Sequence, residues 1–281
     1  MIITLIGSGV MSAGICQVLV SANISVQVNI VARSIEKGEA LKSQVIKQLR
    51  RLVSKGKLEQ VDADKAAESI HLYDTYEACK NSDIVIEAIS EDFTAKLELF
   101  GQLAEHIGKD TIVATNTSSL PITAFASVLP NPNNVIGLHF FNPAPLMELV
   151  EIVSGHETDA ELVTKMCEFT QSLGKKPVIV NEAPGFVVNR MLIPMINEAV
   201  CILAEGVATA EDIDKAMKYG AHHPMGPLAL ADLIGNDVNL SIMDTLYKET
   251  GDPKYRAHPL LRKMVRANYL GRKTKQGFYK Y

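Results

Sequence analysis

The sequence lacks the features that mark several large classes of protein. Lys and Arg total 28 against 32 Asp and Glu, so the 281-residue chain has a formal net charge of −4 and no overall basic field. Nucleic-acid binding usually requires such a field. Its four cysteines stand far apart, with no CxxC pair and no histidine cluster at zinc-ligand spacing. We therefore expect reduced thiols, no metal site and no nucleic-acid partner.

Apolar runs long enough for a membrane are also missing. The N-terminal stretch MIITLIGSGVM has no basic segment and reaches a glycine after six residues, which predicts a strand rather than a secretory signal. The most apolar later stretch, FVVNRMLIPMINEAVCILA, is interrupted by Arg190, Asn197 and Glu198. These features predict a soluble, cytoplasmic protein with no membrane partner.

Short runs rich in Val and Ile alternate with helical patterns through the first two thirds of the chain. The expected strands are residues 2–6, 26–31, 84–88, 112–114, 135–139 and 177–180. The expected helices between them include residues 37–55, 95–107 and 159–173. Such alternation predicts an α/β fold with a doubly wound, mostly parallel sheet.

The pattern changes at Pro184 and Gly185, after which only helices are expected. They cover residues 187–205, 210–219, 228–249 and 259–267. We place the boundary so that residues 1–183 form a dinucleotide-binding domain of the Rossmann type and residues 184–281 a smaller, all-helical domain.

The dinucleotide site is predicted from the glycines after the first strand, in GSGVMSAGI. Gly7 and Gly9 stand where a Rossmann turn needs a tight bend and a close approach to pyrophosphate, and Val10 and Met11 open the following helix. Ser12 occupies the third glycine position of the fingerprint, where it is small enough for a helix to pack on a strand. A glycine-rich turn without a ligand is the alternative.

The choice between NAD and NADP depends on the end of the second strand, NIVARS. NAD-binding folds carry an acid there, but no acid occurs before Glu36. Ala32 best matches the acid's position, although an ungapped count gives Ile30. Arg33 and Ser34 offer a cation and a hydroxyl for a phosphate, so we expect NADP to be favoured over NAD. A surface arginine without a ligand is the alternative.

A histidine ends the apolar run at the start of IGLHFFNPAPLMELVEI. Pro143 and Pro145 break the strand, and MELVEIV alternates as a returning strand, so Glu151 is expected to approach His139. Histidine takes up a proton near neutral pH, and a carboxylate on its second nitrogen fixes the tautomer. A hydrogen-bonded core histidine is the alternative.

Two further features suggest ligand contacts. Ser118 follows the strand at residues 112–114, on the side of a doubly wound sheet where ligands collect, although serine there also caps helices. The stretch KQLRRLVSKGKLEQ offers cations for phosphates, with a solvated helix face as the alternative. Its cations are Lys47, Arg50, Arg51, Lys55 and Lys57.

Five motifs in one order indicate a family. NTSSLPI, GLHFFNPAPLMELVEI, PGFVVNR, HPMGPLAL and KTKQGFYKY together resemble the short, bacterial-type L-3-hydroxyacyl-CoA dehydrogenases over essentially the whole chain. The resemblance implies reversible, nicotinamide-dependent oxidation of an L-3-hydroxyacyl-CoA, such as 3-hydroxybutyryl-CoA, to the 3-oxoacyl-CoA. It also implies a helical domain that contributes to the substrate site and forms a homodimer.

The resemblance also implies roles for individual residues. His139 is the family's base and Glu151 its partner, Ser118 donates to the substrate's 3-oxygen, and Asn189 bonds the substrate oxygens from the helical domain. Positions that match cofactor contacts are Glu91, Lys96, Asn116, Asn142 and Lys273, although Glu91 and Lys96 also suit a solvated helix start. On the substrate side, the matching positions are Ser118, Asn142, Lys55 and Gln48. Lys55 aligns with a coenzyme A contact, and Gln48 replaces a serine that the family often has.

Two alternatives remain open, because one fold hosts many functions. One is a related dehydrogenase of a free hydroxy or sugar acid, against which the basic stretch argues. The other is a non-catalytic cofactor-binding or structural protein on the same fold. That alternative needs a damaged site, whereas His139, Glu151, Ser118 and Asn189 are all present.

Overall fold

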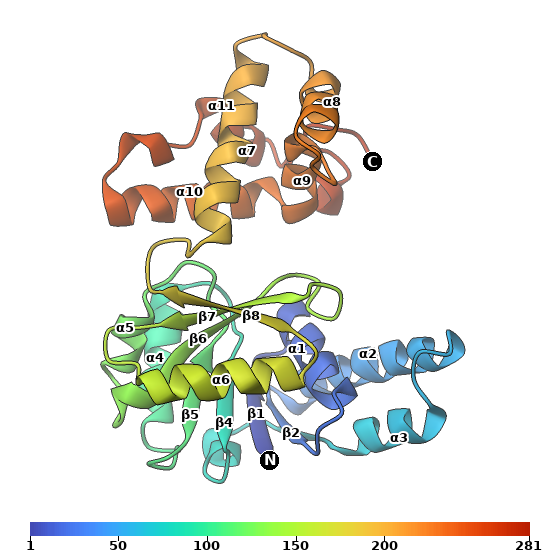
Figure 1. The fold of residues 1–281 in the computed structure, drawn as a ribbon, viewed down its shortest axis with the longest axis vertical. Coiled ribbons are helices and arrows are strands. Elements are labelled where there is room, and N and C mark those ends of the chain that lie inside the picture. The colour runs from blue at the N-terminus through green and yellow to red at the C-terminus, as the bar shows by residue number, and fades with distance from the viewer. The chain divides into compact units, whose positions relative to one another are not determined.

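The chain divides into two compact units. The computed structural model describes all residues from 1 to 281, with unit 1 at Met1–Glu182 and unit 2 at Ala183–Tyr281 (Figure 1). The boundary expected from the sequence, between residues 183 and 184, lies one residue away. None of the helices combines the length and apolar character that crossing a membrane needs.

Unit 1 is built on one eight-stranded sheet of order β3-β2-β1-β4-β5-β6-β7-β8. The strands are β1 Ile2–Ile6, β2 Gln27–Val31, β3 Ile70–Tyr73, β4 Ile84–Glu87, β5 Ile112–Thr115, β6 Val135–Phe140, β7 Leu149–Ser154 and β8 Lys176–Asn181. Neighbouring strands run parallel except β6 and β7, which pair antiparallel. The expected doubly wound, mostly parallel sheet is confirmed.

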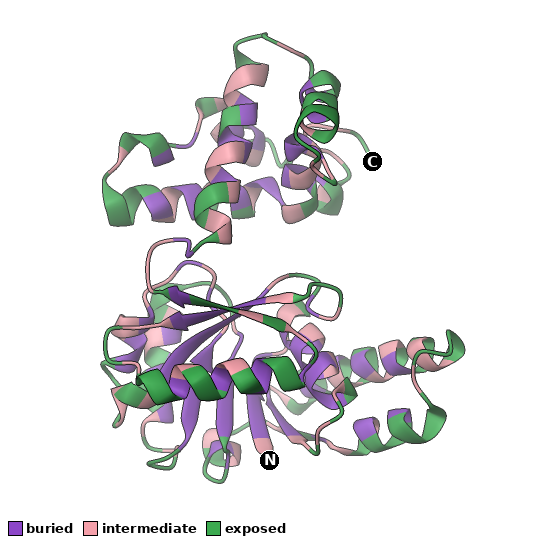
Figure 2. Cartoon of the chain, viewed as in Figure 1, coloured by how far each residue is buried: buried purple, intermediate pink, exposed green.

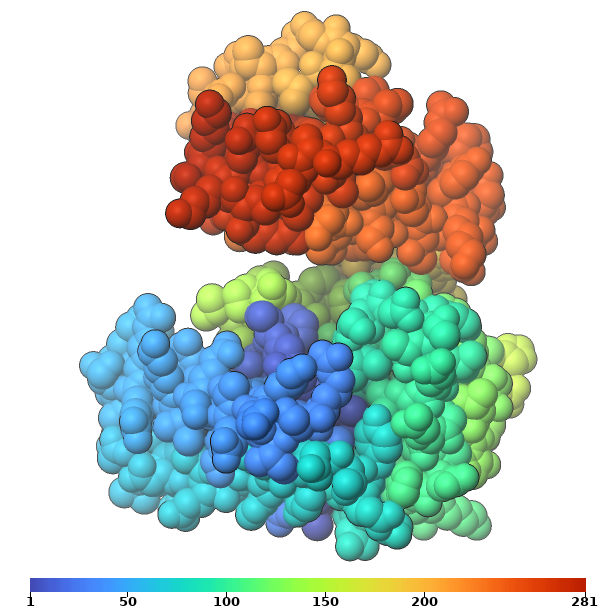
Figure 3. All heavy atoms as spheres, turned by 180° about the vertical axis from the view of Figure 1, so that it is seen from behind, coloured from blue at the N-terminus to red at the C-terminus, as the bar shows by residue number.

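Helices cover both faces of this sheet. They are α1 Val10–Ser21, α2 Ile35–Ser54, α3 Gln60–Glu68, α4 Phe93–Leu103, α5 Ile122–Ala126 and α6 Ala160–Ser172. α1 and α6 lie on one face and α4 and α5 on the other (Figure 1). α2 and α3 form one flank of the unit, seen from behind in Figure 3 as its light blue atoms.

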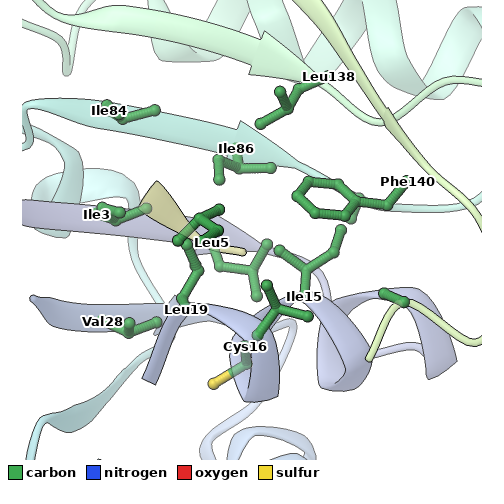
Figure 4. Packing of buried hydrophobic residues seen from close by; sticks show 14 of the residues in the cluster. Ile3, Leu5, Ile15, Cys16, Leu19, Val28, Ile84, Ile86, Leu138 and Phe140 are labelled. Carbon is green, nitrogen blue, oxygen red and sulfur yellow. The ribbon is translucent and has the colours of Figure 1, made fainter. Parts of the chain in front are cut away.

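The core follows from the alternation of strand side chains. Ile3 and Leu5 point toward α1, where they meet Ile15 and Leu19 in one buried cluster (Figure 4). Strands β1, β2, β4, β5, β6 and β7 are buried almost throughout, whereas most of the edge strand β8 and the outward side of α6 are exposed (Figure 2). On the other face, the rings of Phe100 and Phe125 stack with centroids 5.1 Å apart, joining α4 to α5.

Among the elements of unit 1 that were not expected from the sequence are the strand β3 and the helix α3. β3 has only four residues, at the edge of the sheet, and α3 buries only two alanines. Neither segment carries a run of apolar residues long enough to give a clear period. Both lie away from the carboxyl ends of the central strands, where the candidate site forms.

Unit 2 is helical, as expected, with one correction. Its helices are α7 Val188–Ala204, α8 Ala210–Gly220, α9 Pro227–Ile234, α10 Asn236–Thr250 and α11 Pro259–Arg266. The single helix expected over residues 228–249 is wrong, because Gly235 adopts φ 108° and separates α9 from α10. Glycine tolerates this conformation, which ends a right-handed helix.

A buried carboxylate ties the C-terminal segment of unit 2 to its helices. Asp232 on α9 is 1% exposed and accepts hydrogen bonds from the backbone N–H groups of Phe278 and Tyr279. No side chain fits at Gly277, since a Cβ there would lie 1.9 Å from the Asp232 carboxylate. The Gly277, Phe278 and Tyr279 part of the motif KTKQGFYKY therefore has a structural explanation within unit 2.

Candidate active site

The register of β6 and β7 places His139 directly opposite Glu151. Side chains of paired residues lie on the same face of a sheet, so the carboxylate meets the ring. The His139 Nδ1 to Glu151 Oε2 distance is 2.7 Å, and the two side chains are 6% and 1% exposed. The expected approach of these residues is therefore present, and it comes from strand pairing on both sides of the Pro143 and Pro145 loop.

This pairing assigns different tasks to the two ring nitrogens. An ionised carboxylate can only accept a hydrogen bond, so Nδ1 of a neutral His139 carries the proton and donates it to Glu151. Nε2 then holds the lone pair that can take a proton from another molecule. The ring of Phe141 packs against that of His139 with a centroid distance of 4.5 Å, which further restricts its rotation.

Ser118 lies in the loop after β5, where Glu91 binds several groups at once. One carboxylate oxygen of Glu91, Oε1, accepts from the Ser118 backbone N–H at 2.7 Å, the Ser118 hydroxyl at 2.9 Å and the Thr117 hydroxyl at 2.8 Å. Burial raises the pKa of Glu91, but the charge of Lys96 and these hydrogen bonds outweigh it and lower the pKa overall. Glu91 is thus an ionised acceptor. The Ser118 hydroxyl must break its hydrogen bond to Glu91 before it can donate to a substrate oxygen.

Lys96 occupies a different environment from the solvated helix start that was the alternative reading. Its side chain is 1% exposed, and its Nζ lies 2.5 Å from Glu87 Oε1 and 3.5 Å from Glu91 Oε2. In the structure the ammonium contacts the two carboxylates, and the expected contact of Lys96 with a cofactor stays a prediction. Sequence reasoning missed Glu87, whose signal was an acid at the end of the apolar strand IVIE.

Asn116 connects the same loop to the histidine strand. Its side-chain oxygen accepts from the backbone N–H of Phe140 at 2.9 Å, next to His139. Its own backbone N–H donates to the carbonyl of Glu87 at 2.8 Å. Asn116 therefore couples β4 and β6 across β5, and its expected contact near the nicotinamide stays a prediction.

The glycine turn has the form that a pyrophosphate site needs. Gly7 adopts φ 125°, and a Cβ there would lie 2.5 Å from the carbonyl oxygen of Ala88. Gly9 opens α1 with nothing within 4 Å of a Cβ, no side-chain cap and no acid in the first helical turn. Exposed N–H groups and the positive helix end favour an anion there.

The remaining positions of the turn also have clear environments. Ser12 is fully buried, and its hydroxyl donates to the Ala88 carbonyl at 3.1 Å, so serine packs α1 on β4 in place of the third glycine. Val10 is 68% exposed and Met11 half-buried in the first turn of α1. Gly14 brings α1 close to another loop, since a Cβ there would lie 3.2 Å from the Cβ of Ala144.

The end of β2 places Ala32, not Ile30, beside the glycine turn. Ile30 is fully buried inside β2, whereas Ala32 directly follows Val31, whose carbonyl accepts from the Gly7 N–H at 2.9 Å. The next residues, Arg33 and Ser34, are exposed and half-buried before α2 begins. A methyl group therefore occupies the position at which NAD-binding folds carry an acid.

A cavity of about 700 Å³ in unit 1 lies between α1, α2 and the loop that follows β6. Lys55 and Gln48 from α2 and its C-terminal cap line it, as does Asn142 from the loop. Its charged lining residues are all cations, namely Arg51, Lys55, Lys57 and Lys175. The chain is acidic overall, yet the charged side chains that line this cavity are all positive.

The structure separates the basic stretch into two groups. Arg51, Lys55 and Lys57 line the cavity, whereas Lys47 and Arg50 are exposed elsewhere on α2. Sequence reasoning missed Lys175, which lies between α6 and β8 and is far from this stretch in sequence.

Lys175 holds the loop that forms one wall of the cavity. Its Nζ donates to the carbonyl oxygens of Ala144 at 2.7 Å and Met147 at 2.8 Å. Burial lowers the pKa of Lys175, although the nearby Glu148 acts in the opposite direction. The cation thus fixes the wall through backbone contacts.

Two expected site residues belong to unit 2. Asn189 is half-buried in the first turn of α7. Lys273 lies in the short turn Arg272–Thr274, and its Nζ pairs with the Asp237 carboxylate at 2.6 Å. Their expected contacts with substrate and cofactor stay predictions.

Comparisons with known proteins give a family for both units. The model of the 3-hydroxyacyl-CoA dehydrogenase NAD binding domain matches residues 2–183, and the model of the C-terminal domain of 3-hydroxyacyl-CoA dehydrogenase matches residues 185–281. The chain is 54% identical over 282 residues to 3-hydroxybutyryl-CoA dehydrogenase of Clostridioides difficile, covering 99% of each chain. It is 38% identical to the mitochondrial hydroxyacyl-coenzyme A dehydrogenase of Homo sapiens, covering 99% of this chain and 90% of the human one.

A solved structure extends the similarity to the fold. The crystal structure of (S)-3-hydroxybutyryl-CoA dehydrogenase from Ralstonia eutropha matches with a TM-score of 0.95 and 43% identity, covering 100% of this chain and 98% of the other. The resemblance inferred from five motifs is therefore confirmed, and the chain belongs to the 3-hydroxyacyl-CoA dehydrogenase family, a family of oxidoreductases.

Proposed function

We propose that the chain catalyses the reversible oxidation of short L-3-hydroxyacyl-CoA thioesters, 3-hydroxybutyryl-CoA in particular, to 3-oxoacyl-CoA. The observation that carries the proposal is the buried pair of His139 and Glu151, 2.7 Å apart, at the carboxyl edge of a sheet whose chain belongs to this family. The names of the C. difficile and R. eutropha relatives support the four-carbon substrate.

The mechanism assigns the proton to His139. Nε2 takes the proton of the substrate's 3-hydroxyl, while Nδ1–H donates to Glu151 and the carboxylate stabilises the resulting imidazolium. Ser118 exchanges its bond to Glu91 for one to the substrate's 3-oxygen, and Asn189 supplies a second bond to the substrate oxygens. When bound, the nicotinamide accepts the hydride during oxidation and supplies it during reduction.

The residues present fit a dinucleotide. Gly7 and Gly9 would hold its pyrophosphate at the open N-terminus of α1, followed by Val10, Met11 and Ser12. The proposed contacts elsewhere are Glu91, Lys96, Asn116, Asn142 and Lys273. Within this site we favour NADP over NAD, because Ala32 neither accepts from a ribose hydroxyl nor repels a 2'-phosphate, and the exposed Arg33 can donate to one.

The coenzyme A portion fits the cationic cavity. Its lining by Lys55, Gln48 and Asn142, with further cations and no carboxylate, suits a ligand that carries phosphates and a long, largely neutral arm. This lining also favours a thioester over a free hydroxy or sugar acid, which has no phosphates to bind there.

A homodimer formed through unit 2 is part of the same proposal. Unit 2 exposes large apolar side chains on neighbouring helices, including Leu233, Val238 and Tyr247, at 48%, 40% and 43%. Sedimentation at micromolar concentration measures the oligomeric state of the protein. A monomer in that measurement would contradict the proposed homodimer.

The test of the proposed function is a substrate panel. Reduction of acetoacetyl-CoA should exceed reduction of free acetoacetate and sugar-derived keto acids by several orders of magnitude in kcat/KM, because only the thioester carries the phosphates. Comparing kcat/KM for a four-carbon and a ten-carbon 3-oxoacyl-CoA, each with NADH and with NADPH, shows which acyl-chain length and which cofactor the enzyme prefers. A free keto acid as the best substrate would instead identify the related dehydrogenase, and no turnover at all a non-catalytic protein.

A further inference from the structure

Glu87 is a buried charge that the mechanism does not use. Its residue is 0% exposed at the end of β4, and strand pairing places it between Ile6 of β1 and Thr115 of β5. Both of its oxygens are occupied. Oε1 accepts from Lys96 Nζ at 2.5 Å and the Ile89 N–H at 2.7 Å, and Oε2 accepts from the Thr115 hydroxyl at 2.6 Å.

Such a pair needs an explanation other than stability. Removing two charges from water is costly, and a buried ion pair often contributes no more stability than apolar residues of the same volume. Glu87 and Lys96 lie among apolar strands and the buried face of α4, where Leu99, Phe100 and Leu103 pack. Packing of these apolar surroundings therefore does not itself require a charged pair, and the specific contribution of Glu87 is its hydrogen bonds to Ile89 and Thr115.

The contacts of the pair lead to the Ser118 loop by two routes. On the first, Lys96 Nζ lies 3.5 Å from Glu91 Oε2, and the other oxygen of Glu91 holds the backbone and hydroxyl of Ser118. On the second, the Thr115 hydroxyl that donates to Glu87 accepts from the Thr117 backbone N–H at 3.1 Å. Both ends of the pair thus fix the backbone on either side of Ser118.

We propose that Glu87 and Lys96 form a buried positioning pair that sets the orientation of Ser118 for the reaction in two ways. Lys96 keeps Glu91 in place as an ionised acceptor, and Glu87 holds the Thr117 backbone through the Thr115 hydroxyl. This inference rests on the proposed function for its kinetic consequences. It assigns Glu87 a role in the site and gives Lys96 an indirect one, through Glu91.

The charges that face Glu91 determine in which direction its pKa changes when the pair is removed. Lys96 on α4 is the cation beside it, Glu87 on β4 lies behind that cation, and Asp92 is the neighbouring acid, whose carboxylate accepts from the Ala95 N–H. The loop after β5 contributes only neutral donors. Removing Lys96 therefore raises the pKa of Glu91, and the loop loses its ionised acceptor at a higher pH than in the wild type.

The test removes both charges together, so that no unpaired charge stays in the core. In Glu87→Gln/Lys96→Met, the amide still accepts from Ile89 or Thr115, and the net charge is unchanged. The matched control, Glu77→Gln/Lys80→Met, makes the same changes at an exposed pair whose side chains are 55% and 54% exposed. Activity is measured with acetoacetyl-CoA over a range of pH, together with thermal unfolding.

We expect the core variant to lose about tenfold or more in kcat while the KM for the thioester changes by less than about threefold, since the loop is misplaced but the cavity is intact. The acid limb of its kcat/KM profile should move to higher pH. The control should match wild type. A folded core variant with wild-type kcat and an unmoved acid limb would show a purely structural pair.

Glu91→Gln tests the route of the effect. The Glu91 side chain is 35% exposed, so this variant removes the charge without disturbing the core. Because the amide in Glu87→Gln can still accept from Thr115, the core variant loses mainly the route through Glu91. The same two changes in the Glu91→Gln background should therefore cost no more than about twofold further in kcat. Fully additive losses would overturn the inference.

Two further measurements cover a core variant that fails to fold or a wild type without turnover. Thr115→Val keeps both charges and removes only the hydroxyl between Glu87 and Thr117, and wild-type kcat in this variant would overturn the inference. In ligand-free wild-type protein, the backbone N–H resonances of Ser118 and Ser119 should shift together as Glu91 titrates below its ordinary pKa of 4.5. Absence of that common titration overturns the inference whatever the activity, whereas lack of turnover with acetoacetyl-CoA overturns the proposed function.

Discussion

His139 and Glu151 are direct cross-strand partners on the antiparallel pair β6 and β7, with Nδ1 and Oε2 2.7 Å apart and both side chains buried. Because the strand pairing sets their separation, the contact between Nδ1 and the Glu151 carboxylate comes from the strands, and Phe141 in the following loop adds a second restriction on the ring. A base held in this way is ready in one tautomer before substrate arrives.

Glu151→Gln should lower the rate without removing the ring. The amide keeps the size of the side chain but cannot stabilise an imidazolium, so we expect kcat with acetoacetyl-CoA to fall by at least about tenfold. The KM for the cofactor should change little, since Glu151 lies in the sheet away from the glycine turn. A glutamine variant with wild-type kcat would leave Glu151 as a packing residue only.

Asn189→Ala tests the contribution of unit 2. The side chain lies in the first turn of α7, so the change should leave the helix and its circular dichroism intact. If its amide bonds the substrate oxygens, kcat should fall by about 10–100-fold, the loss of one or two hydrogen bonds to a developing charge. Unchanged turnover in a folded variant would return Asn189 to a structural role.

Lys55→Met tests the coenzyme A cavity. The KM for acetoacetyl-CoA should rise by about fivefold or more, because one cation facing the phosphates is lost, and kcat should stay close to wild type. Lys47→Met is the matched control on the same helix, outside the cavity lining. Equal effects in the two variants would mean that the basic stretch acts only as a solvated face.

Ala32→Asp/Arg33→Gln tests the cofactor preference. Wild type should use NADPH with a higher kcat/KM than NADH, and the double variant should reverse the order, since an acid there accepts from ribose and repels a 2'-phosphate. Arg33→Gln alone, at an exposed position, should weaken only the use of NADPH, and Lys47→Gln should change neither. A wild type that prefers NADH by tenfold, or a double variant with the same preference, would contradict the expectation.

The sequence predicted the fold where periodicity was strong and the site where motifs were local. β6 and β7 could be predicted to meet because two prolines separate an apolar run from an alternating one, which brings His139 to Glu151. The division of one expected helix at Gly235 could not be predicted, because a single glycine is tolerated within many helices. Only its φ of 108°, seen in the structure, shows that the helix ends there. The environment of Lys96 was equally hidden, since its partner Glu87 lies on another element and the pairing depends on how α4 packs.

The most direct test of the account is the turnover of acetoacetyl-CoA by His139→Gln beside wild type and His156→Gln, a histidine variant whose side chain is 81% exposed. We predict a loss of about 10²–10⁴-fold in kcat for His139→Gln, the contribution of a general base, with cofactor binding retained, and no loss for His156→Gln. A folded His139→Gln enzyme that keeps more than a tenth of the wild-type rate would contradict the assignment of the base and the mechanism built on it.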